Sequence, residues 1–104
     1  MPDDRIEIEN ANTPGRTEWV NRSKYLAMRE ALLAVLPGQP PGLTTASAKE
    51  ALLPLLPQAL FPEGKTAGWW LKAVQLDLEV KGVVQREARK PVHLYRAGLA
   101  QHLP

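Results

Sequence analysis

The side chains that offer the clearest chemistry are cations near the end of the chain. Residues 81–96 hold five basic residues against one acidic residue, whereas residues 1–20 hold five acidic residues against two arginines. Guanidinium and ammonium groups gathered in one segment suit contacts with phosphate oxygens. The charge pattern therefore favours a binding function toward nucleic acid, although the net charge of +2 is small.

Metal and acid–base chemistry have no matching arrangement in the sequence. The chain has no cysteine, and neither His93 nor His102 has a second ligand at metal-binding spacing. Asp77 and Glu79 are two positions apart in an expected helix and point about 200° away from each other, so they are not a carboxylate pair. We expect no metal site and no catalytic residue.

One segment invites comparison with a phosphate-binding loop. Gly64-Lys65-Thr66 has the end of that motif and precedes an expected helix, but Ala59 stands where the first glycine is required. The start of a helix is the better interpretation. The sequence thus predicts a protein that is not an enzyme and uses no cofactor.

The elements that must position the cations can be predicted from local patterns. Alternating residues at 6–9 and 17–20, separated by a segment with Asn, Pro and Gly, predict an N-terminal hairpin. Asn21 is placed to cap a first helix, which ends at Pro37-Gly38. A second helix begins near Thr45 and kinks or stops around Leu53, because Pro54 lacks an amide hydrogen.

The third helix starts at 65–67 and ends at Gly82. Its main apolar face combines Ala67, Trp70, Leu71, Val74 and Leu78. Opposite lies a narrow polar wedge that includes Lys72 and Gln75. Trp70 belongs to the core by this pattern, whereas Trp69 fits either the core or a binding contact.

The helix is followed by a basic hairpin over residues 83–96, and this order is typical of a winged-helix domain. The polar wedge would then face the bases of double-stranded DNA, and the hairpin, or wing, would contact phosphates. The predicted nucleic-acid-binding residues are Lys72, Gln75, Arg86, Arg89, Lys90 and Arg96. The alternative for the hairpin is a solvated turn whose charges prevent edge-to-edge aggregation.

A second apolar strip on the third helix suggests a different partner. It consists of Trp69, Ala73, Leu76 and Val80. Such a strip suits a self-complementary contact across a two-fold axis. The alternative function is accordingly a protein–protein interaction module that forms a homodimer.

Length and composition set the class of protein. A chain of 104 residues with 44% hydrophobic and 23% charged residues is expected to form one domain with one core. The charged start lacks the apolar stretch of a signal peptide, and no apolar run is long enough for a membrane span. We expect a cytoplasmic protein that does not enter a membrane.

Several segments together resemble a family of short uncharacterised bacterial proteins. They are Ile6-Glu7-Ile8-Glu9-Asn10, Pro14-Gly15-Arg16, Tyr25 with Met28, Gly42-Leu43-Thr44, Phe61-Pro62, and Gly68-Trp69-Trp70 through Glu79 to Lys81-Gly82. More remotely, the order of helices and hairpin is similar to the winged-helix superfamily, whose members bind DNA, RNA or other proteins. That resemblance implies a non-catalytic binding module, such as a DNA-associated regulator.

The predicted fold is therefore one α+β, winged-helix-like domain. It contains an N-terminal β-hairpin, three helices and a C-terminal β-hairpin wing. The domain spans residues 6–96, with an N-terminal tail at 1–5 and a C-terminal tail at 97–104. Two departures from the usual pattern are a long, proline-rich segment at 54–65 and a first wing-sheet strand reduced to about Gly42-Leu43.

Overall fold

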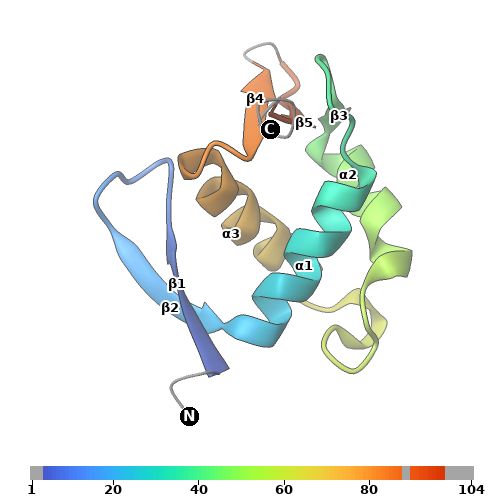
Figure 1. Cartoon of the computed structure of the whole chain (residues 1–104). Helices are drawn as coiled ribbons and strands as arrows, with labels where there is room; N and C mark the ends of the chain where they lie inside the picture. The colour runs from blue at the N-terminus through green and yellow to red at the C-terminus, as the bar shows by residue number, and fades with distance from the viewer. Residues whose placement is uncertain (1–3, 88–89, 98–104) are drawn as a thin grey trace, which may run out of the picture.

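A computed structural model of the chain describes residues 4–87 and 90–97. Within these residues the chain forms eight helices and strands, with two short 3-10 turns between α2 and α3; Figure 1 shows their arrangement. In chain order they are β1 (Arg5–Glu9), β2 (Thr17–Asn21), α1 (Arg22–Val35), β3 (Leu43–Thr44), α2 (Thr45–Leu52), η2 (Leu53–Leu55), η3 (Pro62–Gly64), α3 (Ala67–Val80), β4 (Val84–Glu87) and β5 (His93–Arg96).

The strands form two small antiparallel sheets, and this arrangement confirms the predicted α+β, winged-helix-like fold. β1 and β2 make a separate hairpin, while the other sheet has the order β3-β5-β4. The short strand β3 therefore joins the wing from a distant part of the chain. β1 begins at Arg5, one residue before the predicted domain boundary, and residues 98–104 of the predicted tail lie outside the described residues.

Local side-chain chemistry fixes the ends of the helices as predicted. The Asn21 side chain accepts a hydrogen bond from the Lys24 amide at 2.9 Å and caps α1. α2 gives way to the 3-10 turn at Leu53, one residue before Pro54. Gly82 follows α3 with a φ of +76°, the left-handed conformation that closes a helix.

One glycine is required by the pairing of β3 with β5. Gly42 has a φ of +88°, and a Cβ at this position would lie 2.0 Å from the carbonyl oxygen of Leu94. Only glycine permits that approach of two backbones. It brings Leu43 opposite Leu94 and Thr44 opposite His93, so that the amino end of α2 lies beside the wing.

The core lies between the three helices and the inner sides of both sheets. All five residues of the predicted main face of α3 are buried in it, with Val74 completely inaccessible to solvent. Met28 and Leu32 of α1 and Leu52 of α2 are equally inaccessible. The apolar periodicity of the helices therefore identified the core correctly.

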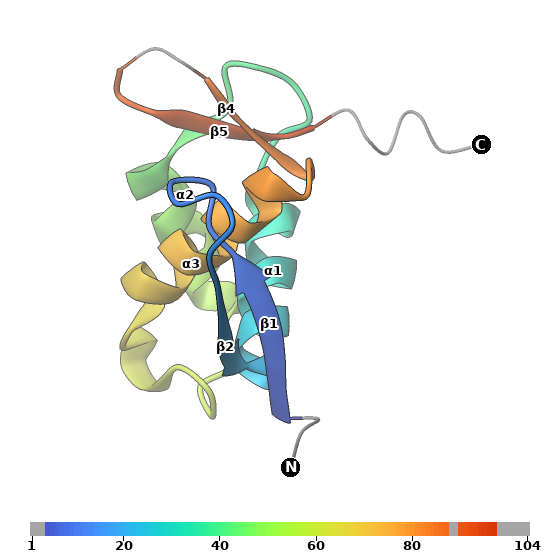
Figure 2. The ribbon, with the colours of Figure 1, turned by 90° about the vertical axis from the view of Figure 1, so that its left-hand side faces the viewer.

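The N-terminal hairpin packs along one side of α3 (Figures 1 and 2). Ile8 and Val20 turn inward and are buried, while Glu7 and Trp19 lie opposite each other on the outer face. The hairpin is also held by a polar contact, because the Glu9 amide donates to Asp77 Oδ1 of α3 at 2.9 Å. One side of α3 is consequently occupied by the chain itself.

Candidate nucleic-acid interface

The outward-facing surface of α3 is open at its amino-terminal half and largely covered at its carboxy-terminal half. Gly68, Trp69 and Lys72 are exposed, and Trp69 is 54% exposed. Further along the helix, Gln75 and Leu76 are only 3% and 4% exposed. Any partner that reads α3 must therefore approach its first two turns.

Two lysines from different helices meet at this open half of α3. Lys49 of α2 and Lys72 of α3 line a shallow groove of about 250 Å³, with Thr45, Ala46, Gly68, Leu71 and Gln75 as the other lining residues. Lys49 reaches across the groove, since a Cβ built on Gly68 would lie 3.5 Å from its Nζ. Among the described residues neither lysine forms an ion pair. We call Lys49 and Lys72 the groove lysines.

Gln75, which was predicted to contact bases, has a buried side chain that is already hydrogen-bonded within the chain. Its Nε2 donates to Glu79 Oε2 at 2.7 Å. The other oxygen of the same carboxylate, Oε1, accepts from Arg86 Nη2 at 2.7 Å and from Nε at 3.2 Å. This chain of contacts ties α3 to strand β4 and leaves Gln75 unavailable to a partner.

The wing cations differ in how they are placed. Arg86 is engaged by Glu79, and Arg96 donates from Nε to the carbonyl oxygen of Leu36 at 2.9 Å. Arg96 therefore holds the carboxyl end of α1, where positive charge is favourable. Both guanidinium groups, predicted to contact phosphates, already have partners within the chain. Lys90 is exposed, and Arg89 lies outside the described residues.

The predicted dimer strip on α3 is not continuous in the structure. Leu76 is buried, and Ala73 is half-buried beside the N-terminal hairpin. Trp69 and Val80 remain exposed, but they are eleven positions apart on the helix, a distance of about 16 Å along its axis. The sequence pattern could not show that the chain's own hairpin lies beside Ala73 on this strip.

The other side of α3 carries a buried polar cluster that sequence reasoning did not identify. Asp77 is fully buried, and its carboxylate accepts from Tyr25 Oη at 2.5 Å, from Lys81 Nζ at 2.5 Å and from the Glu9 amide. Burial, and then the hydrogen bond to Asp77 and its negative charge, raise the pKa of Tyr25 above its ordinary range. The cluster joins β1, α1 and α3, and its groups are all satisfied.

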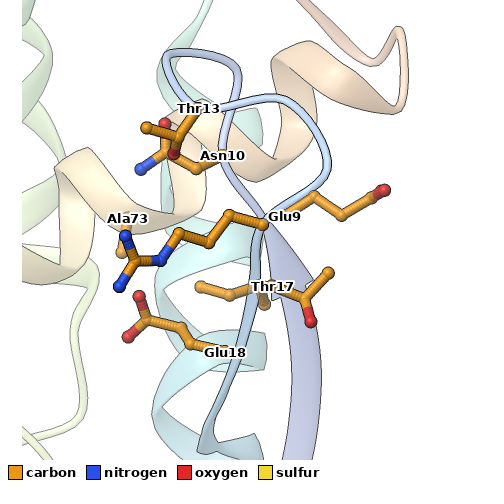
Figure 3. A pocket seen from close by; sticks show the side chains of 8 residues that line it. Glu9, Asn10, Thr13, Thr17, Glu18 and Ala73 are labelled. Atoms are coloured by element: carbon orange, nitrogen blue, oxygen red, sulfur yellow. The ribbon is translucent and has the colours of Figure 1, made fainter.

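A second hollow, of about 310 Å³, separates the N-terminal hairpin from α3 (Figure 3). Asn10 and Thr13 lie above it in this view, Glu18 lies below it, and Ala73 belongs to the neighbouring helix. Arg16 also contributes to its lining. Because charges of both signs surround the hollow, it favours no single class of charged ligand.

Residues 5–94 match a family of unknown function (DUF6958). The chain belongs to this family. The match spans β1 through the buried Leu94 of β5, and so includes the groove lysines and the Asp77 cluster. No curated protein and no solved structure matches the chain.

Two searches of the described residues bear on other kinds of site. Within residues 4–87 and 90–97, no cluster of three or more His, Cys, Asp or Glu side chains could hold a metal ion. Across the same residues, no helix has both the length and the apolar character needed to cross a membrane.

Lys49 lines the groove but was not singled out from the sequence. It follows Ala48 of the buried face of α2, so its register alone places it at the edge of that face. Whether this edge meets α3 or solvent depends on the angle at which the two helices cross. Helical periodicity gives no information on that angle. The sequence did carry one weak signal for Lys49. It is the basic residue of α2, the helix that would precede the recognition helix in a winged-helix domain.

Proposed function

We propose that this protein is a non-catalytic, winged-helix-like module that binds double-stranded DNA through the amino-terminal half of α3. The observation that carries the proposal is the convergence of Lys49 and Lys72 on one groove beside the open turns of α3. In this account Lys72 and Lys49 contact phosphates, and the exposed first turn of α3 approaches the bases.

Electrostatics support an anionic partner at this surface. α3 begins without a side-chain cap, so the partial positive charge of its amino end adds to the charges of the two lysines. Neither lysine is neutralised by a carboxylate among the described residues. Phosphate contacts of this kind position a protein on the duplex, while side chains at the start of a recognition helix contact bases.

The wing strands β4 and β5 lie across the top of the molecule in Figure 2, and β3, which leads directly into α2, pairs with β5. Thr44, the residue before α2, pairs with His93 of the wing, and Lys90 is exposed three residues away from His93. Lys90 is therefore proposed as a further phosphate contact. Arg86 and Arg96 are proposed to hold the wing in place, because their partners lie within the chain.

The proposal is tested by titrating a fluorescent mixed-sequence DNA duplex with the protein over a range of salt concentrations. Each phosphate neutralised by a cation contributes about 0.9 to the slope of log affinity against log salt. Lys49→Ala combined with Lys72→Ala should reduce that slope by about 1.8. Thermal unfolding followed by circular dichroism establishes that the variant is folded.

A matched control removes the same charge from another surface. Arg5 and Arg16 are exposed on the N-terminal hairpin, so Arg5→Ala with Arg16→Ala should leave the slope close to that of the parent. Equal losses in both double variants would mean that only net charge matters. A parent protein whose binding is absent at low salt would contradict the proposal outright.

A further inference from the structure

The exposed tryptophan of α3 is held in a fixed orientation. The Trp69 ring lies edge-to-face against Trp70, with centroids 5.0 Å apart and planes at 80°. Trp70 is 8% exposed and lies edge-to-face against Phe61, which is 1% exposed. A half-exposed indole packed against one core ring loses less freedom on binding than an unsupported one, and this lowers the entropic cost of a contact.

Trp69 shares the open surface of α3 with the groove lysines. It is three residues before Lys72, a spacing that makes the two side chains neighbours on a helix. Trp69 is in the first turn of the helix, where recognition helices contact base edges. An indole at this place would therefore meet the major groove while Lys72 contacts the backbone.

Gly68 adds an independent observation. Glycine is a poor helix former, yet Gly68 has no positive φ, and a Cβ there would meet only Lys49 Nζ at an ordinary 3.5 Å. The fold itself therefore does not require glycine at this position. A missing side chain beside Trp69 leaves room for a partner to approach the helix closely.

We infer that Trp69 contacts the 5-methyl group of thymine in the major groove and so makes this surface prefer A·T base pairs. Thymine supplies the only methyl group among the base edges of that groove; cytosine presents a smaller C5–H there, and the other groups are polar donors and acceptors. The exposed part of the indole is largely apolar ring surface, with one N–H donor. This inference rests on the proposed DNA-binding function and names the feature that its α3 surface reads.

The test uses three alternating duplexes of equal length, made of A·T, A·U or G·C base pairs. Replacing thymine by deoxyuridine removes only the methyl group, so the parent protein should bind the A·T duplex about fourfold more tightly for each methyl buried. Trp69→Ala should abolish this discrimination while keeping the salt dependence that the groove lysines provide. Trp19→Ala, at an indole 58% exposed on the hairpin, should keep the discrimination.

The outcomes separate the inference from the proposed function. Salt-dependent binding with equal affinity for the A·T and A·U duplexes overturns the thymine contact but leaves DNA binding standing. Discrimination that survives in a folded Trp69→Ala variant also overturns it, as does a loss of binding to all three duplexes alike. Absence of binding to every duplex at low salt overturns the proposed function and the inference together.

Discussion

Charged side chains around α3 are used in two opposite ways. Asp77, which contacts β1 and α1, and Glu79, which contacts the wing, are engaged by Tyr25, Lys81, Gln75 and Arg86. On the side that faces α2, Lys49 and Lys72 are exposed over a groove and form no ion pair within the described residues. The difference teaches that the number of cations in a segment says little about which of them can reach a partner.

The largest effect is expected from Asp77→Ala. Removing this fully buried carboxylate leaves Tyr25 Oη, Lys81 Nζ and the Glu9 amide without their acceptor, which should destabilise the domain by about 3–5 kcal/mol. The measurement is urea-induced unfolding. Asp77→Asn, which can still accept from the Glu9 amide, is the matched control and should cost less. An unchanged midpoint for Asp77→Ala would remove the cluster from the account.

A pH-dependent loss of stability should follow from Tyr25. Its pKa is raised in the folded protein, so unfolded chains lose this proton above about pH 10 while folded chains keep it. Stability is therefore fully present below pH 10 and falls as the pH rises further. Urea unfolding at pH 9 and pH 11 should show a steeper decline for the parent than for Tyr25→Phe. Parallel declines would contradict the raised pKa.

A smaller effect is expected at the contact between α3 and the wing. Arg86 is about one-third exposed, so solvent screens its pair with Glu79, and Arg86→Met should cost about 0.5–1 kcal/mol. A double-mutant cycle with Glu79→Gln isolates the pair from other losses. A coupling energy of zero would mean that Arg86 does not hold the wing, and would return it to the set of candidate phosphate contacts.

The smallest effect on stability is expected on the open side of α3. Lys49→Ala and Lys72→Ala remove exposed side chains without described ion-pair partners, so each should change the free energy of unfolding by less than about 0.5 kcal/mol. Urea midpoints measured together with the Arg86 variant provide the comparison. A decrease of more than about 1 kcal/mol in the free energy of unfolding at either lysine would show that this side chain stabilises the fold.

Much of the fold could be predicted from the sequence because its signals are local. The cap at Asn21, the break before Pro54 and the stop at Gly82 depend on neighbouring residues alone. The pairing of β3 with β5 was anticipated only as a reduced strand, and it depends on a backbone approach that Gly42 permits.

The candidate site was harder to predict because its contacts join distant segments. Asp77 meets Tyr25 across 52 positions and the Glu9 amide across 68. Helical periodicity placed Gln75 with Lys72 on one polar wedge, but the wing buries Gln75 through Glu79 and Arg86. The position of the N-terminal hairpin beside α3, which places Ala73 against it, likewise depends on contacts between distant segments.

The most direct test of this account compares the two classes of cation on DNA. The slope of log affinity against log salt would be measured on one duplex for Lys49→Ala/Lys72→Ala and for Arg86→Met/Arg96→Met, at a temperature where both variants are folded. The account predicts a slope reduced by about 1.8 for the lysine variant and unchanged for the arginine variant. A reduced slope for the arginine variant, with the lysine variant like the parent, would contradict it.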